Sequence, residues 1–148
     1  MRIAIASDHA ALELKAELAA WLTSEGHDVA DLGPHSADRV DYPDYGYKLA
    51  DAVASGKAER GIALCGSGIG ISIAVNRNPA CRCALVNEPV SAGLSRSHND
   101  ANVIAMGERL VGIDMAKACL KAFLGTDFLG DRHTGRVEKL GQPPVPAV

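Results

Sequence analysis

Short apolar runs and amphipathic stretches alternate along this chain. The apolar runs occupy Arg2–Ser7 and residues 27–33, 60–66, 81–87 and 102–108. Between the first two runs, Leu14, Leu18 and Leu22 recur at helical spacing, and Gly26 provides a helix stop signal. Further helical patterns cover residues 43–55, 69–77, 89–97 and 113–124. The sequence therefore predicts five strands that alternate with helices.

Such alternation is typical of a parallel sheet with helices on both faces. Residues 62–65, 83–86 and 103–106 lack polar alternation, as expected of strands covered on both sides. We predict an α/β fold with three layers, α/β/α, around a five-stranded parallel Rossmann-like sheet. The pattern alone allows the strand order 2-1-3-4-5. A chain of 148 residues suits a single domain over residues 1–148, with a partly extended tail over residues 126–148.

Composition restricts the partners of the chain. The formal net charge is −3, which gives no overall attraction to nucleic acid or to an anionic membrane. No apolar run reaches the roughly 18 residues of a membrane span, and the first run ends too early for a signal peptide. The four cysteines lack a secretory context, which favours reduced thiols and a cytoplasmic location. Cys81 and Cys83 form a C-x-C pair without the further ligands that zinc needs, so we expect no metal.

Candidate chemistry gathers where the first and third predicted strands end, the edge at which parallel sheets bind ligands. Asp8 and His9 follow the first strand. Cys65 ends the third and is followed by Gly66, Ser67, Gly68, Ile69 and Gly70. A glycine-rich turn that leads into a helix presents backbone N–H donors to negative charge. The helix dipole favours the Cys65 thiolate as nucleophile or general base, although a buried structural cysteine is an equal alternative.

The residue at position 71 excludes three better-known glycine-rich loops. A P-loop needs Lys and then Ser or Thr after its last glycine, but Ile71 and Ser72 stand there. A dinucleotide fingerprint would have glycine at position 71. A C-x5-R phosphatase would have arginine at the same position. The remaining role for this loop is stabilisation of a developing oxyanion.

Six further polar positions are candidates, and each also has a structural interpretation. His98 and Asn99 lie in the polar segment S-H-N-D before the fifth strand, and Tyr42 precedes a turn proline. Arg132 and Arg136 concentrate cations in the tail, and Arg109 follows the fifth strand. The arginine fork suits a phosphate, whereas such clusters are more often solvated surface charges.

The motifs S-D-H-A, D-Y-P-D-Y, L-C-G-S-G-I-G-I-S, N-E-P, S-R-S-H-N-D-A-N-V-I-A-M-G and R-H-T-G-R-V together resemble the ribose/galactose isomerase family, over residues 1–140. The resemblance implies interconversion of ribose 5-phosphate and ribulose 5-phosphate without a cofactor, and the strand order 2-1-3-5-4. It implies that Cys65 is the base, that residues 66–70 hold an enediolate, and that His98 opens the sugar ring with help from Ser67. A branch with glutamate at position 71 lacks the cysteine, so this chain resembles the cysteine branch.

The resemblance also implies the remaining contacts. Asp8, His9, Tyr42 and Asn99 are expected to line the sugar site, and the phosphate is expected to meet His9, Arg109, Arg132 and Arg136. Galactose 6-phosphate and allose 6-phosphate remain alternative substrates, and a non-catalytic sugar-phosphate-binding protein remains an alternative class. A sensor would not need Cys65 together with His98.

The order of residues along the strands predicts a site shared between two subunits. Cys65 ends a strand, whereas His98 precedes one, so the two lie at opposite edges of one parallel sheet. A five-residue strand spans roughly 17 Å, too far for a side chain to bridge. We therefore expect a homodimer with two composite sites, and leave open whether dimers pair into tetramers.

Overall fold

The computed structural model describes residues 1–145. In chain order its elements are β1 (Arg2–Ser7), the 3-10 helix η1 (His9–Ala11), α1 (Leu12–Ser24), β2 (Asp28–Asp31), α2 (Tyr42–Ala54), β3 (Arg60–Cys65), α3 (Ile69–Val75), β4 (Cys83–Leu85), α4 (Pro89–Asn99), β5 (Val103–Gly107), α5 (Ile113–Gly125), the 3-10 helix η2 (Asp131–His133) and α6 (Thr134–Leu140). The predicted strands and the five predicted helices all form.

The five strands pair in parallel in the order β2-β1-β3-β5-β4. This confirms the predicted three-layer α/β fold. The order is the one that the family resemblance implies, because β5 inserts between β3 and β4 instead of following β4. The carboxyl ends of β1, β3 and β5 therefore lie side by side at one edge of the sheet, with Leu64 opposite Ser7 and Cys65 opposite Gly107.

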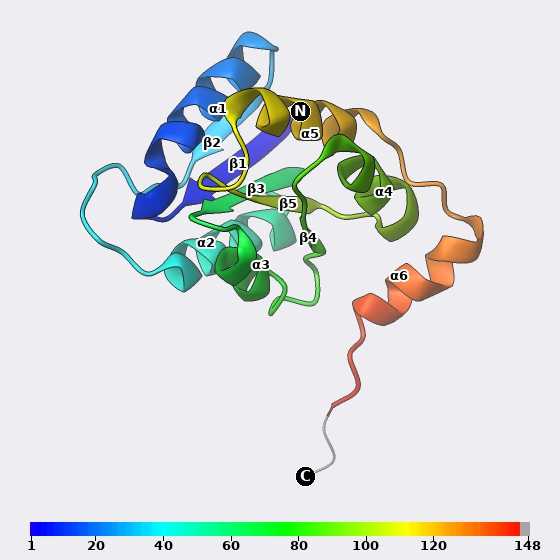
Figure 1. Cartoon of the computed structure of the whole chain (residues 1–148). Helices are drawn as coiled ribbons and strands as arrows, with labels where there is room; N and C mark the ends of the chain where they lie inside the picture. The colour runs from blue at the N-terminus through cyan, green and yellow to red at the C-terminus, as the bar shows by residue number, and fades with distance from the viewer. Residues whose placement is uncertain (146–148) are drawn as a thin grey trace.

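Helices lie on both faces of the sheet (Figure 1), and each face has its own hydrophobic core. On one face, Ile3 and Ile5 of β1 pack with buried side chains of α1, α4 and α5. On the other, Ala4 and Ala6 pack with buried side chains of α2 and α3. The two sets alternate because successive side chains of a strand point to opposite faces. Cys65 belongs to the second core and ends its strand on the face that α3 covers.

β4 departs from the expectation that residues 83–86 form a strand covered on both faces. It is the last strand of the sheet, Cys83 and Ala84 are only half-buried, and Leu85 is 40% exposed. An apolar run does not distinguish a buried central strand from an edge strand that is covered by another chain. The position of β4 in the sheet was decided by long-range pairing.

The tail contains more helix than its sequence pattern predicts. Residues 131–140 form η2 and α6, whereas residues 126–130 and 141–145 are irregular, and the rest of the expected tail, residues 146–148, lies outside the described residues. No residue of α6 is buried, so its sequence carries no apolar periodicity to detect. Figure 1 shows α6 extending beyond the sheet and its covering helices.

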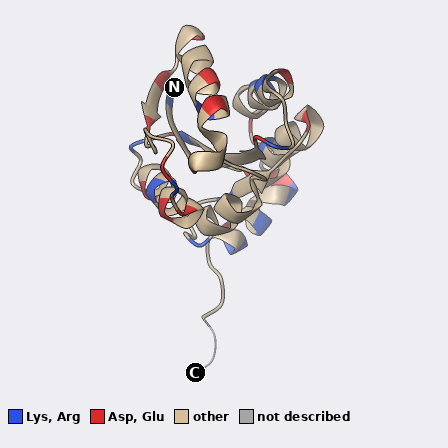
Figure 2. Ribbon diagram, turned by 60° about the vertical axis from the view of Figure 1, so that its left-hand side comes forward, with Lys and Arg blue, Asp and Glu red and all other residues tan. Residues whose placement is uncertain are grey.

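The surface mixes charges of both signs. In the view of Figure 2, Lys and Arg lie among Asp and Glu over the helices and loops. Among the described residues, no helix has the length and apolar character needed to cross a membrane.

Candidate active site

The end of β3 and the loop after it form the centre of the site. Cys65 is 4% exposed, and its Sγ accepts a hydrogen bond from the backbone N–H of Gly68 at 3.1 Å. Gly68 has φ +77°, and a Cβ there would lie 2.7 Å from the carbonyl carbon of Met106. Only glycine fits both that backbone conformation and that close approach. The loop thereby turns the N–H of Gly68 back toward the cysteine sulfur, and α3 begins at Ile69.

The end of β5 fixes this loop from the side. The N–H of Glu108 donates to the carbonyl of Cys65 at 3.0 Å, and the N–H of Arg109 donates to the carbonyl of Gly66 at 3.1 Å. A Cβ added to Gly66 would lie 3.3 Å from Cζ of Arg109, so the guanidinium lies directly against the loop. Gly107 permits the contact, since a Cβ at that position would lie 2.4 Å from the carbonyl carbon of Ser67.

The end of β1 supplies the opposite wall. Asp8 is 7% exposed, and its Oδ1 accepts the N–H of Ala10 at 2.9 Å, which caps η1. The ring of His9 is tied to the loop before α2, because its Nδ1 lies 3.2 Å from both the backbone N and O of Val40. Tyr42 begins α2 and lays its ring on Gly70, where a Cβ would lie 2.5 Å from ring carbons.

These three strand ends enclose a cavity of about 490 Å³, large enough for a small sugar phosphate. It brings together most of the residues predicted from the sequence, and its lining is Asp8, His9, Ala10, Tyr42, Cys65, Gly66, Ser67, Ile69, Gly70, Ile73 and Arg109. Gly68 contributes through its N–H bond to the cysteine sulfur. Cys65, at the centre of this lining, is in contact with the cavity.

The sequence interpretation missed two residues of this lining, Ala10 and Ile73. Ile73 follows Ile69 by one helical turn, and the two side chains are 51% and 50% exposed. The signal was present, because two isoleucines four positions apart share one face of α3. The spacing does not by itself indicate a site, since an apolar pair four positions apart is usually part of a buried core.

The other predicted site residues lie at the opposite edge of the sheet. His98 and Asn99 belong to the last turn of α4, which continues to residue 99 instead of ending at residue 97. The polar letters S-H-N-D look like a loop, but Asp100 closes the helix in the left-handed region with φ +46°. Arg132 lies in η2 and Arg136 in α6, and both are exposed.

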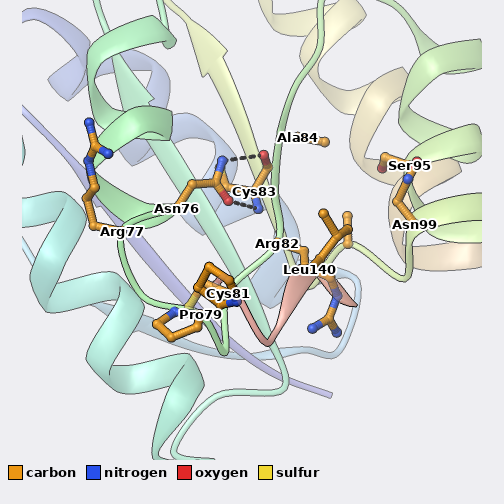
Figure 3. Close-up of a pocket in the computed structure, with 12 residues that line it drawn as sticks. Asn76, Arg77, Pro79, Cys81, Arg82, Cys83, Ala84, Ser95, Asn99 and Leu140 are labelled. Carbon is orange, nitrogen blue, oxygen red and sulfur yellow. Dashed lines mark hydrogen bonds between the residues drawn. The ribbon is translucent and has the colours of Figure 1, made fainter. Parts of the chain in front are cut away.

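A second cavity, of about 470 Å³, lies beside the amino end of β4 (Figure 3). Asn99 and Ser95 of α4 border it on one side and Asn76, after α3, on the other, and Leu140 of α6 also contributes. The Asn76 amide is occupied by hydrogen bonds to the backbone N and O of Cys83, at 2.8 and 2.9 Å. Asn99 is thus separated from the Cys65 cavity within one chain.

The remaining thiols differ from Cys65 in their surroundings. Burial raises the pKa of the thiols of Cys81, Cys83 and Cys119, so all three stay protonated at neutral pH. Within residues 1–145, no three or more His, Cys, Asp or Glu side chains gather in an arrangement that could hold a metal ion. In the same part of the chain, none of the ion pairs involves Arg109, Arg132 or Arg136.

Comparison with known proteins decides the family. The family model described as Ribose/Galactose Isomerase matches residues 3–140. The chain belongs to the ribose/galactose isomerase family. Within this family it is 46% identical over 139 residues to ribose-5-phosphate isomerase B of Escherichia coli, covering 94% of this chain and 93% of the relative.

Two other members of the ribose/galactose isomerase family are similar to this chain over nearly its whole length. The D-erythrulose-4-phosphate isomerase of Pectobacterium atrosepticum is 39% identical over 142 residues, covering 95% of this chain and 93% of that relative. The structure of ribose-5-phosphate isomerase B from Clostridium thermocellum superposes with a TM-score of 0.94 at 48% identity, covering 96% of both chains. The fold is therefore shared with a ribose-5-phosphate isomerase, and the sequence similarity to sugar-phosphate isomerases extends over nearly the whole chain.

Proposed function

We propose that this protein is an aldose–ketose isomerase that interconverts ribose 5-phosphate and ribulose 5-phosphate. One observation carries the proposal: Cys65 lines a cavity of sugar-phosphate size, and the N–H of Gly68 in the loop that follows donates to its sulfur. The similarity to ribose-5-phosphate isomerase B, at 46% identity, favours this pair of sugars over those of the tetrulose phosphate isomerase, at 39%.

The chemical step is a proton transfer between neighbouring carbons. The hydrogen on C2 of the open-chain aldose is acidic because C2 adjoins the C1 carbonyl. The Cys65 thiolate removes this proton, and the electron pair left on C2 moves into the C1–C2 bond to give an enediolate. The thiol then returns the proton to C1, while the O2 proton moves to O1 and C2 becomes the carbonyl. The amides of residues 66–70 stabilise the negative oxygens that form on the way.

Before that step the furanose ring must open. The C1–O4 bond breaks, O4 gains a proton, and the C1 hydroxyl loses one. We assign this proton exchange to His98, assisted by the hydroxyl of Ser67. Ser67 lines the Cys65 cavity, whereas His98 lies in the last turn of α4 at the other edge of the sheet.

That separation supports a homodimer with composite sites. The partner subunit would supply His98, Asn99, Arg132 and Arg136 to the cavity formed by the strand ends. A set of exposed apolar side chains on α3, β4 and α4 is available for such an interface: Ile69, Ile73, Leu85, Val90 and Leu94. Exposed apolar patches of this kind mark contacts with other chains.

The phosphate would bind between cations of both subunits. Arg109 and His9 line the cavity in one chain. Arg132 and Arg136 are exposed and take part in none of the ion pairs of residues 1–145, so their guanidinium groups are free to meet an anion. The proposed chemistry uses only side chains and backbone amides of the protein, without a cofactor. The free cysteines support a reducing, cytoplasmic location.

A panel of sugar phosphates tests the substrate. We expect the highest kcat/KM for ribose 5-phosphate, with lower values for allose 6-phosphate, galactose 6-phosphate and erythrulose 4-phosphate. A larger kcat/KM for one of the other sugars would replace the proposed substrate. A protein that only binds sugar phosphates would convert none of them, and that result would reject an isomerase altogether.

A further inference from the structure

His133 packs the tail against α4. Within residues 126–145 it is the only buried side chain, 8% exposed, whereas Leu129 and Leu140 are 63% and 54% exposed. Its ring stacks on the ring of His98, with centroids 4.5 Å apart and an interplanar angle of 13°. At this point of the tail the buried side chain is therefore an imidazole and not one of the two leucines.

Two hydrogen bonds to the backbone of the tail fix its approach to α4. The N–H of Leu129 donates to the carbonyl of Ser97 at 3.0 Å, and Nε of Arg96 donates to the carbonyl of Thr126 at 3.3 Å. Arg96 is itself buried and belongs to the same helix as His98. The stacked position of His133 is therefore set by the fold and not by the free rotation of an exposed side chain.

The groups around His133 keep its ring neutral. Burial lowers the pKa of His133, and the nearby His98, Arg132 and Arg136 lower it further, against the opposing effect of Asp131. Nε of Arg132 lies 3.5 Å from Nε2 of His133. Two adjacent imidazolium rings would repel each other, so a neutral His133 can remain stacked when His98 takes up a proton.

We propose that His133 is a positioning residue for ring opening, with its ring plane holding the imidazole of His98 in the orientation needed for proton exchange. The inference rests on the proposed function of His98. A proton donor must be aligned with the atom it serves, and stacking covers one face of the ring while leaving its nitrogen-bearing edge free. Since the interaction is through the ring face, another flat ring at position 133 should be able to hold His98 in the same way.

The two substrates separate ring opening from the later proton transfer. Ribose 5-phosphate is a furanose and requires opening. Ribulose 5-phosphate is acyclic, because its O5 is phosphorylated and cannot close on C2, and its open-chain aldose product can leave and close in solution. A merely structural loss would slow both directions alike.

The experiment compares His133→Ala and His133→Phe in the full-length protein. We expect His133→Ala to lower kcat for ribose 5-phosphate by about tenfold or more, with kcat for ribulose 5-phosphate within about twofold of the unmodified protein. His133→Phe should restore kcat for ribose 5-phosphate to within about threefold of the unmodified protein. Lys139→Ala, an exposed change on α6, is the matched control and should alter neither rate.

Nuclear magnetic resonance of the His98 ring tests the contact without activity. His133→Ala should shift the His98 ring protons by removing the neighbouring ring current, and His133→Phe should largely preserve their positions. Equal losses with both sugars, or a Phe variant as slow as the Ala variant with ribose 5-phosphate, would overturn the proposal. If the unmodified protein converted neither sugar, the proposed function would fail, whereas an unchanged His98 spectrum in His133→Ala would refute the stacking itself.

Discussion

At the scale of single residues, the site depends on where side chains are missing as much as on where they are present. Gly68 brings its N–H within 3.1 Å of the Cys65 sulfur, and its own Cβ would collide with the backbone of β5. Gly107 allows the backbone of Ser67 to approach from the other side. The cysteine sulfur thus accepts a main-chain N–H because the loop and the end of β5 pack together without side chains between them.

Replacing the sulfur should abolish the base and preserve the fold. We expect Cys65→Ala to lower kcat by at least about a hundredfold, the lower end of general-base contributions, since no other thiol lines the cavity. Cys119→Ala is the matched control, because Cys119 is buried in α5 and far from the substrate. Steady-state kinetics with ribulose 5-phosphate measures both variants. Turnover by Cys65→Ala close to that of the control would remove this cysteine from the mechanism.

Adding a single methyl group at the end of β5 should distort the loop. A Cβ at Gly107 would lie 2.4 Å from the backbone of Ser67, and backbone cannot rotate away as a side chain can. We expect Gly107→Ala to lower the free energy of unfolding by about 2 kcal/mol, as overpacking does. Gly125→Ala has open space around it and should change stability by less than about 1 kcal/mol. Urea denaturation compares the two variants. Equal free energies of unfolding would mean that the loop adjusts to the added methyl group without loss of stability.

At the scale of elements, one buried ion pair joins α1 to β2 and to the loop that follows. Nζ of Lys15 donates to both carboxylate oxygens of Asp31, at 2.6 and 2.8 Å, and to the carbonyl of Pro34 at 2.9 Å. Asp31 also accepts the N–H of Gly33 at 2.8 Å. This loop leads to Val40, the anchor of His9, so the pair connects packing of the helix with one wall of the site.

Substitutions of Asp31 and of Lys15 should lower the free energy of unfolding by different amounts. The Lys15 side chain is 4% exposed and that of Asp31 is 33% exposed. Asp31→Ala leaves a buried ammonium without its counter-ion and should cost about 3 kcal/mol of unfolding free energy. Lys15→Met removes the buried charge and leaves a carboxylate that water can reach, so a cost of about 1 kcal/mol is expected. Urea denaturation at neutral pH gives the order, and a reversed order would contradict this account.

At the scale of the whole molecule, the residues proposed to act together lie at two edges of the sheet. Cys65, Arg109 and His9 lie at the carboxyl edge, and the residues of α4, η2 and α6 lie at the other. The edge strand β4 and the neighbouring helices α3 and α4 expose apolar side chains between them. A twofold axis near β4 would bring each edge to the complementary edge of the other subunit.

Hybrid dimers should therefore recover activity. In a mixed dimer of Cys65→Ala and His98→Ala chains, one of the two composite sites contains an intact Cys65 and an intact His98. Random pairing makes half of the dimers mixed, so about a quarter of the unmodified activity with ribose 5-phosphate is expected. Each variant alone, treated identically, is the control. Mass measurement must show dimers and subunit exchange, and exchange without regained activity would exclude the shared site.

Local sequence patterns were enough to predict the elements and the position of the candidate chemistry along them. Apolar periodicity located the five strands and five of the helices to within about two residues, because side-chain alternation is a local property. The position of Cys65 before a glycine-rich turn placed it at a strand end, where parallel sheets gather ligands. The family motifs added the strand order and the expected roles.

How these elements pack against one another depended on long-range contacts. It made β4 an edge, extended α4 through His98 and Asn99, and folded residues 131–140 into helix. It also placed His133 on His98, a contact between residues 35 positions apart in sequence with no periodic signal. Strand pairing, the identity of the edge strands and the stacking of the two rings depend on which distant segments pack together and exclude water. No local sequence pattern encodes those contacts.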